Sequence, residues 1–509
     1  MSAKDSFEEN EQRHPKATFP HHQLDWRWVE RYRELASFDS YSWLAPAGPF
    51  MQEEQQQWDQ LYSQNIDEAT KEQLGKLIAQ SCQRELLAAI AEQREPRLHY
   101  PAIPIEEVRS RITDLLQLDE EISQDEPNAI VRRLYHDTIE EEIWFLRLIE
   151  ATYEGNSERF WQYNLLLNPV PTLEEMKYTL SRVRHIILQG LLHSETVEAS
   201  QQVIRFLQEQ LQLSLDLSYT EHEAQELQKN IPLSPPQPQH MVSAQTARRF
   251  FETVLHENGF EEWQVNIDPN ASVPRVEQGL RCLYLPDSKI SLHQIKHYVS
   301  HELAGHVARC IAGERSLLGL LGIHTKHSLE TEEGLATYYD IQSAKLLGQA
   351  HDETGVWFGT LATGLASGIV TPPQTFLSLF TFFDLFIFLY RLLKRPDQNA
   401  QTAKRQAQKL ALARCLRTYR GLPDLKRKGI CYTKDALYLR GLWKIEQSLA
   451  NDKTILDRLA VGVVALDRLP DLQELGIVTA PQPLRKLMSN PDLDAYILSF
   501  ETPEEHTPQ

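Results

Sequence analysis

The chain has 509 residues, of which 41% are hydrophobic and 24% are charged, and its formal net charge is −19. These values are typical of a soluble globular chain of two to four domains, and they exclude a fibrous protein, a disordered protein and a disulfide-stapled miniprotein. The five cysteines are odd in number and never spaced as CxxC, which predicts a reducing, cytoplasmic environment.

The polar residues 1–22 contain no apolar core, so they predict a disordered tail and no signal peptide. Residues 23–230 predict a helical N-terminal region, because apolar residues recur there at helical spacing. Clustered prolines in residues 231–242 predict a linker, since proline removes a backbone donor and ends helices. The helices predicted before the linker are Thr70–Gln93, Ala129–Ala151, Leu173–Leu192 and Ser194–Leu227.

Residues 243–498 predict a second, catalytic region, and residues 499–509 a disordered tail. In chain order, the patterns predict a helix, two short strands and a further helix. These elements are Ser243–Glu257, Trp263–Ile267, Arg281–Leu285 and Leu292–Ala312.

The most apolar window of the chain is Phe376–Leu393, which is almost long enough to span a membrane. Asp384 lies in its middle and Arg391 near its end, which favours a buried helix and makes a membrane partner unlikely. The alternative left open is a membrane-attached or scaffold protein that uses this helix.

The charge is uneven along the chain. All of the acidic excess lies in residues 1–240, whereas residues 391–440 hold 14 Lys or Arg against three Asp. Such a segment attracts an anion, which is either the acidic N-terminal half, a nucleic acid, or an acidic peptide or free carboxylate. No nucleic-acid recognition motif accompanies the basic residues and the whole chain is acidic, so we expect no nucleic-acid partner.

The chemistry is concentrated between His297 and His306, in the sequence HYVSHELAGH. In the HExxH pattern two histidines four residues apart share one helical face and bind Zn²⁺, and the glutamate acts as a base. Here His301 and His306 are five apart, which on a regular helix leaves them about 140° apart. A one-residue π-bulge would bring them together, and Gly305 lies where the backbone must deform.

A second pairing needs no bulge, because His297 and His301 are four residues apart. It would leave Glu302 outside the pair. The run Thr331–Ala336 (TEEGLA) offers a carboxylate as a third ligand. The alternative is that Thr331 caps a helix whose first turn contains the acidic residues, which would explain the same residues without a metal.

Together, HELAGH (His301–His306), Arg309, Gly313 and EEGLA (Glu332–Ala336) resemble the QEGLA-motif HExxxH metallopeptidases. That family includes tubulin tyrosine carboxypeptidases and the bacterial flavohaemoglobin expression-modulating proteins. Tyr419–Gly421 and Tyr432–Tyr438 with Gly441 resemble its RG and FTKD-x-x-Y-x-x-G segments. Two departures are Glu332 in place of Gln and the absence of Gln-Pro after Gly313.

The resemblance implies zinc held by His301, His306 and Glu333, with Glu302 as general base. It also implies a mainly α (α+β) fold, in which the helical N-terminal half packs on a zincin-like catalytic region with a small β-sheet and a bulged metal helix. The partner implied is the C-terminus of a peptide or protein, possibly acidic. The alternative is a non-catalytic, metal-stabilised regulatory or binding protein.

A carboxypeptidase needs a cation for the terminal carboxylate of its substrate, which a guanidinium group binds best. The candidates lie in the basic segment and are Arg417, Arg420, Lys434 and Arg440. Tyr338, Tyr339 and Tyr438 are candidate donors to the oxyanion, with Tyr438 also a candidate substrate contact. Arg309 is interpreted either as a further candidate or as the partner of an acidic residue that supports the metal helix.

Overall fold

The computed structural model describes residues 23–36, 43–45, 86–98, 100, 102–229, 240–268, 274–348, 354–396, 398–480, 482 and 484–501. The predicted tail at 1–22, most of the predicted helix Thr70–Gln93 and residues 231–239 of the linker lie outside these residues.

The N-terminal half is helical, as predicted. Two of its helices begin at strong caps: the Asn128 side chain accepts backbone hydrogen bonds from Ile130 and Val131, and Thr172 and Glu175 form a reciprocal capping box. The helices are α2 (Val29–Leu35), α5 (Ile105–Asp125), α6 (Ala129–Tyr153), α7 (Ser157–Leu167), α8 (Leu173–Leu191), α9 (Val197–Glu209) and α10 (Glu221–Lys229).

The single helix predicted over Ser194–Leu227 is wrong. The chain leaves the helix after Glu209 and returns to it at Glu221. Between these points Leu211, Leu213, Leu215 and Leu217 alternate with polar residues, and this period of two fits extended backbone. The guanidinium of Arg184 donates to the carbonyls of Asp216 and Ser218 and so holds this segment against α8.

After the linker, the structure contains two small sheets among the described residues. β2 (Gln264–Asp268) runs parallel to β4 (Cys282–Pro286), and β3 (Arg275–Glu277) pairs antiparallel with the other edge of β4. The predicted strands correspond to β2 and β4. β1 (Met241–Val242) pairs with β5 (Ile290–Ser291), so the linker ends two residues earlier than predicted.

The rest of this region is helical, and it continues to Glu501, beyond the predicted start of the C-terminal tail at residue 499. There Phe500 packs against Phe250, with ring centroids 5.9 Å apart. The elements are α11 (Ala244–Glu257), α12 (Leu292–Tyr298), η2 (Val299–Val307), α13 (Ala308–Glu314), η3 (Gly319–Gly322), α14 (Ser328–Leu346), α15 (Thr354–Ser367), α16 (Phe376–Lys394), α17 (Ala400–Thr418), η4 (Lys434–Ala436), α18 (Leu437–Asn451), α19 (Ile455–Leu459), η5 (Leu466–Arg468), α20 (Leu469–Glu474), α21 (Arg485–Met488) and α22 (Leu493–Leu498).

The apolar helix α16 is the one described helix that is long and apolar enough to cross a membrane, and 56% of its apolar window is buried inside the protein. It packs against α8, α9, α15 and α17. The carboxylate of Asp384 lies 2.6 Å from the ammonium of Lys404 on α17, so the charge inside the apolar window is paired within the fold. This packing favours the interpretation of α16 as a core helix.

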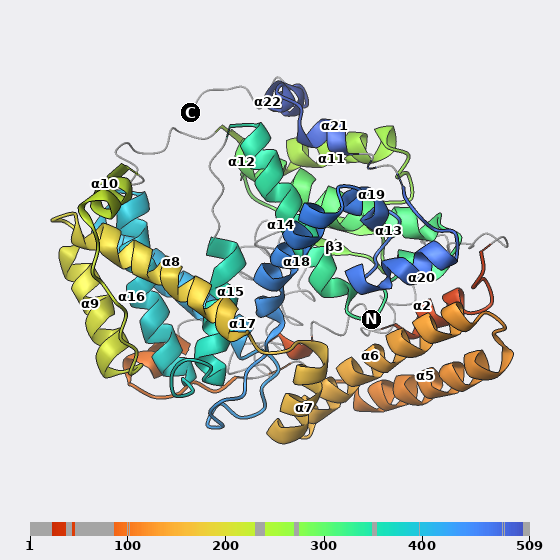
Figure 1. Ribbon diagram of the computed structural model, residues 1–509, viewed down its shortest axis with the longest axis horizontal. Coiled ribbons are helices and arrows are strands. Elements are labelled where there is room, and N and C mark those ends of the chain that lie inside the picture. The colour runs from red at the N-terminus through yellow and green to blue at the C-terminus, as the bar shows by residue number, and fades with distance from the viewer. Residues whose placement is uncertain are drawn as a thin grey trace, which may run out of the picture.

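The two halves share one hydrophobic core, which contains residues from both sides of the linker. Figure 1 shows α14 and α18 near the centre, with α5, α6 and α7 on one side and α8, α9 and α16 on the other. A buried aspartate joins the N-terminal segment to the second region, because Asp25 accepts backbone hydrogen bonds from Gly319 and Leu320, each of 2.8 Å. The predicted mainly α fold with a small sheet is confirmed.

Candidate metal centre and adjoining pocket

The helix that carries the histidines is irregular in its middle. α12 continues into the π-helix η2, and α13 follows. In a π-helix the backbone hydrogen bonds join residues five apart, so His301 and His306 lie one above the other, with ring centroids 5.3 Å apart. The predicted bulge is present and brings the two imidazoles together.

Small residues place α14 close to this π-helix. A Cβ atom added to Gly305 would lie 2.5 Å from the Cβ of Ala336, and one added to Gly334 would lie 2.2 Å from the backbone carbonyl carbon of Gly441. Glycine at both positions therefore allows α14 to pack closely between η2 and α18. The Gly-Leu-Ala part of EEGLA thus sets the position of the glutamates that precede it.

The alternative interpretation of Thr331 as a helix cap is wrong. α14 begins at Ser328, three residues earlier, and His327 precedes it with a left-handed φ of 58°. The hydroxyl of Thr331 instead accepts a hydrogen bond of 3.1 Å from the backbone N–H of Leu466. The glutamates of EEGLA therefore lie in the second turn of the helix, where capping does not explain them.

Three side chains converge between η2 and α14. One donor atom from each of His301, His306 and Glu333 lies within 4.8 Å of the other two, so the group could hold a metal ion. The Nε2 atom of His301 is 3.9 Å from Oε2 of Glu333. Two imidazoles and one carboxylate form a donor set that zinc accepts in hydrolytic sites, so the residues present fit this ion.

A second carboxylate orients His306. Its Nδ1 lies 2.8 Å from Oε1 of Glu332, and because a carboxylate only accepts, Nδ1 carries the proton and Nε2 is left for the metal group. Burial disfavours the charged imidazole, but Glu332, Glu333 and Glu302 outweigh it and raise the pKa of His306 to about 9. The carboxylates around this ring thus favour a positive charge at the site.

Arg309 supports the metal helix by bonds to backbone carbonyls. It is only 2% exposed, and its guanidinium donates to the carbonyls of Leu459, Gly462 and Val464. Burial works to raise the pKa of Glu332, but His306 and Arg309 together lower it below its usual value. The predicted pairing with an acidic residue is therefore wrong for these hydrogen bonds, whose acceptors are backbone carbonyl oxygens.

The alternative pairing of His297 with His301 differs from the pairing with His306 in its carboxylate, because the group of donor atoms that could hold a metal ion consists of His301, His306 and Glu333. The His297 ring is near that of His301, with centroids 5.2 Å apart, but its Nδ1 lies 2.9 Å from Oδ1 of Asp340. The hydroxyl of Ser300 donates to the same carboxylate oxygen over 3.0 Å. His297 therefore lies beside the metal group, held by Asp340.

Glu302 follows His301 within the π-helix. Burial raises its pKa, the positive charge of His306 partly offsets this, and Glu333 raises it further. A carboxylate with a raised pKa is better suited to accept and return a proton near neutral pH. Burial and Glu333 thus raise the pKa of the side chain that the sequence predicted to act as a base.

A pocket of about 420 Å³ opens beside His301. Its walls come from α12, α14, α15, α17 and the start of α18. Two guanidinium groups and a tyrosine hydroxyl are among its polar groups. Its lining residues include His297, His301, Thr337, Asp340, Arg414, Arg417, Asp435 and Tyr438.

Two arginines in this pocket share one buried aspartate. Asp435 Oδ2 lies 2.6 Å from Arg414, and Arg417 contacts the same carboxylate through both of its oxygens, at 2.7 and 2.9 Å. Burial would raise the pKa of Asp435, but Arg417 and Arg414 hold it well below its usual value. One carboxylate thus holds two guanidinium groups in the wall of the pocket.

The predicted substrate residues divide between different places. Arg417 and Tyr438 line the pocket beside His301. Arg440 does not: two of its guanidinium nitrogens bond to the Glu175 carboxylate, at 2.7 and 2.9 Å, which anchors α18 to α8. Arg420 lies near Tyr100, and Lys434 lines a separate and larger cavity.

Sequence reasoning missed Arg414 and Asp435. The signal was available: Arg414 and Arg417 are three residues apart on one helix and so share a face, and Asp435 is the aspartate of the Thr433-Lys434-Asp435 segment. Of the candidate tyrosines, Tyr438 lines the pocket, whereas Tyr339 lies in a small hollow beside Arg309. Tyr338 packs against Tyr339, with ring centroids 6.3 Å apart.

Part of the chain is similar to a family of peptidases. Residues 386–503 match the model of the family described as microtubule-associated tyrosine carboxypeptidase. This match confirms the relation to tubulin tyrosine carboxypeptidases that the motifs predicted, and it covers Arg414, Arg417, Asp435 and Tyr438. The group of His301, His306 and Glu333 lies outside the matched residues. No curated protein matches the chain.

Proposed function

We propose that the chain is a zinc-dependent carboxypeptidase that removes the C-terminal residue of a peptide or protein in the cytoplasm. The observation that carries the proposal is the convergence of His301, His306 and Glu333 beside Glu302. The similarity of residues 386–503 to a carboxypeptidase family supports it independently, since those residues supply the arginines of the adjoining pocket.

Each part of the site has a role in this reaction. His301, His306 and Glu333 would hold the zinc ion, which when bound lowers the pKa of a water molecule and polarises the scissile carbonyl. Glu302 takes the proton from the attacking water and returns it to the amine of the departing residue. Glu332 keeps His306 in the tautomer that leaves Nε2 for the ion.

The pocket beside His301 would receive the residue that is removed. Arg417 bonds to the carboxylate of Asp435 with two nitrogens, and its side chain is 46% exposed, so it can also reach the terminal carboxylate of a substrate. Tyr438 lines the same pocket and can donate to that carboxylate or to the developing oxyanion. The name of the matched family makes a C-terminal tyrosine the first residue to test.

The test is hydrolysis of a peptide that ends in tyrosine, followed by mass spectrometry, with zinc content measured on the same preparation. We expect one zinc ion per chain, release of the terminal residue, and loss of activity in Glu302→Gln while the metal stays bound. Glu446→Gln, on the exposed face of α18, is the matched control and should retain activity.

Two outcomes would contradict the proposal. Undiminished hydrolysis by Glu302→Gln would show that Glu302 is not the general base. A zinc-loaded chain that cleaves no peptide, and whose fold melts on His301→Ala, would identify the group as a structural metal site in a non-catalytic protein.

A further inference from the structure

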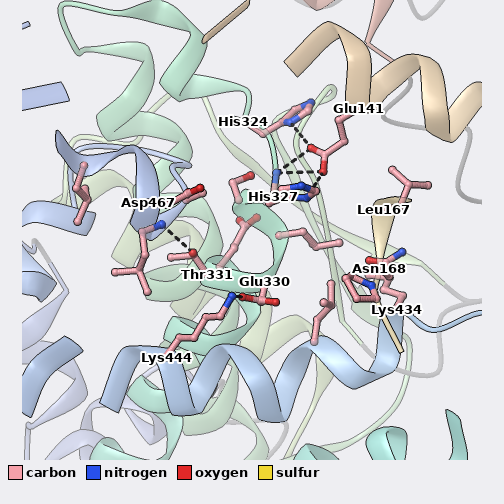
Figure 2. A pocket seen from close by; sticks show the side chains of 18 of the residues that line it. Glu141, Leu167, Asn168, His324, His327, Glu330, Thr331, Lys434, Lys444 and Asp467 are labelled. Atoms are coloured by element: carbon pink, nitrogen blue, oxygen red, sulfur yellow. Dashed lines mark hydrogen bonds and ion pairs between the residues drawn. The ribbon is translucent and has the colours of Figure 1, made fainter. Parts of the chain in front are cut away.

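A second and larger cavity lies near the first turns of α14. Its volume is about 860 Å³, against about 420 Å³ for the pocket beside His301. Figure 2 shows side chains entering it from several elements: Glu141 from α6, His327 and Glu330 at the start of α14, and Lys444 from α18. Glu332 belongs to the wall of this cavity and also contacts the metal group, through its hydrogen bond with His306.

The metal group lies between the two cavities along α14. Glu330 and Glu332 line the large cavity, Glu333 belongs to the metal group, and Thr337 and Asp340 line the smaller pocket. Because Glu332 lines the large cavity and contacts His306 directly, this cavity comes within one side chain of a proposed metal ligand.

The segment that begins α18 shows the same division. Lys434 and Leu437 face the large cavity, whereas Asp435 and Tyr438 face the smaller pocket. Two elements that are distant in the sequence thus separate the same two spaces. A chain cleaved at the metal group must extend on both sides of it, and the protein has a hollow on each side.

The walls of the large cavity match the chemistry of a polypeptide. Nδ1 of His327 lies 3.1 Å from Oε1 of Glu141, and the Lys444 ammonium pairs with the Glu330 carboxylate. Donors and acceptors therefore occur on both sides of the space. Leu167 and Phe145 add apolar surface to the lining. Peptide groups alternate donors with acceptors and carry apolar side chains, which suits such a mixed lining.

We propose that the large cavity binds the substrate segment that precedes the C-terminal residue. The inference rests on the proposed carboxypeptidase function, and it makes the natural substrate a polypeptide with an accessible tail and not a free dipeptide. Ten helical residues separate Glu330 from Asp340, a rise of about 15 Å. An extended chain covers about 3.3–3.6 Å per residue, so a substrate needs about four or five residues to reach both cavities.

The experiment is a series of N-acetylated peptides of two to eight residues with the same C-terminal tyrosine, assayed for kcat/KM on the zinc-loaded full chain. We expect kcat/KM to rise at least about 10-fold between two and six residues and then to level off, because remote contacts contribute to catalysis only when the substrate reaches them. Equal rates at all lengths would overturn the inference and leave the carboxypeptidase proposal intact.

A pair of variants assigns the length dependence to this cavity. Gln447 is exposed on α18 and lines the cavity, whereas its neighbour Glu446 is exposed and is not among the lining residues. Gln447→Trp should lower the ratio of kcat/KM for the six-residue peptide to kcat/KM for the two-residue peptide to about one. Glu446→Trp should leave this ratio unchanged.

Three further outcomes are decisive. A ratio that Gln447→Trp does not change, or one that both variants lower equally, would overturn the assignment to this cavity. If the zinc-loaded protein cleaves no peptide of any length, the carboxypeptidase proposal fails and this inference fails with it.

Discussion

The imidazole of His306 donates through Nδ1 to the carboxylate of Glu332 over 2.8 Å, between a π-helix and the helix that supplies Glu333. The first position of this EEGLA segment is Glu here, where the QEGLA pattern has Gln. Glutamate at this position affects His306 directly, because a charged acceptor increases the basicity of the imidazole that it holds. A glutamine would accept the same hydrogen bond without the charge.

We expect Glu332→Ala to weaken zinc binding by about 10- to 100-fold and Glu332→Gln by less, since partners of this kind typically contribute that much to metal affinity. The measurement is zinc affinity by competition with a chelator. Glu330→Gln is the control, because Glu330 pairs with Lys444 and is not one of the three residues of the metal group. Zinc affinity of Glu332→Ala equal to that of the wild type would show that the contact has no role at the metal.

The contact between Gly334 and Gly441 leads to a prediction about stability. A Cβ atom at position 334 would lie 2.2 Å from the backbone of Gly441, where no flexible side chain can move away. We expect Gly334→Ala to lower the free energy of unfolding by about 1–3 kcal/mol, the usual cost of overpacking, and to weaken zinc binding because Glu333 moves with α14.

The matched control is Gly355→Ala in α15. That glycine is helical, and a Cβ atom added to it would have nothing within 4 Å, so alanine should be neutral or stabilising by up to about 1 kcal/mol. Thermal unfolding of both variants, with and without a chelator, separates packing from metal binding. Equal melting temperatures for the two variants would contradict the packing argument.

The fold and the site differ in how far the sequence predicted them. The bulge follows from local geometry, because two histidines five residues apart can share an ion only if the helix changes its period. The break between Glu209 and Glu221 was also local, since its alternating leucines have the period of extended chain. The helix prediction overlooked this because leucine, glutamine and glutamate also favour helices.

The substrate pocket depends on tertiary contacts and could not be predicted as a whole. Arg417 and Arg440 are equivalent in sequence as basic residues near the RG and FTKD segments, yet one faces the pocket and the other is bonded to Glu175 on α8. The partner of Arg440 lies 265 residues away in the sequence. A basic segment therefore indicated an anion site, but not which cation belongs to it.

Arg417 leads to a prediction about substrate recognition. We expect Arg417→Ala to raise KM for peptides with a free C-terminal carboxylate by about 10- to 100-fold, since a hydrogen bond to a charged group contributes about 1.5–3 kcal/mol. Peptides with a C-terminal amide should bind wild type and variant equally weakly. Arg427→Ala, in the same basic segment but paired with Glu158 at the surface, is the control. If Arg417→Ala raised KM equally for peptide acids and peptide amides, Arg417 would not be the group that recognises the C-terminal carboxylate.

The buried carboxylate of Asp435 leads to a prediction about pH. Arg417 and Arg414 outweigh burial and lower its pKa in the folded protein, whereas an unfolded aspartate has a pKa of about 3.9. The folded state therefore binds this proton more weakly than the unfolded state. The stability that Asp435 contributes is fully present above about pH 4 and is lost as pH falls towards the folded pKa.

We expect Asp435→Asn to lower the free energy of unfolding at pH 7 by about 3 kcal/mol, because it leaves the buried Arg414 without its carboxylate. Below about pH 4 the difference from wild type should narrow by about 1.4 kcal/mol per pH unit. Urea unfolding at pH 7, 5, 4 and 3.5 measures this difference, with the exposed Asp424→Asn as control. A difference that stays constant on acidification would show that Asp435 is not held ionised by the two arginines, and the cationic pocket beside His301 would then lack its anchor.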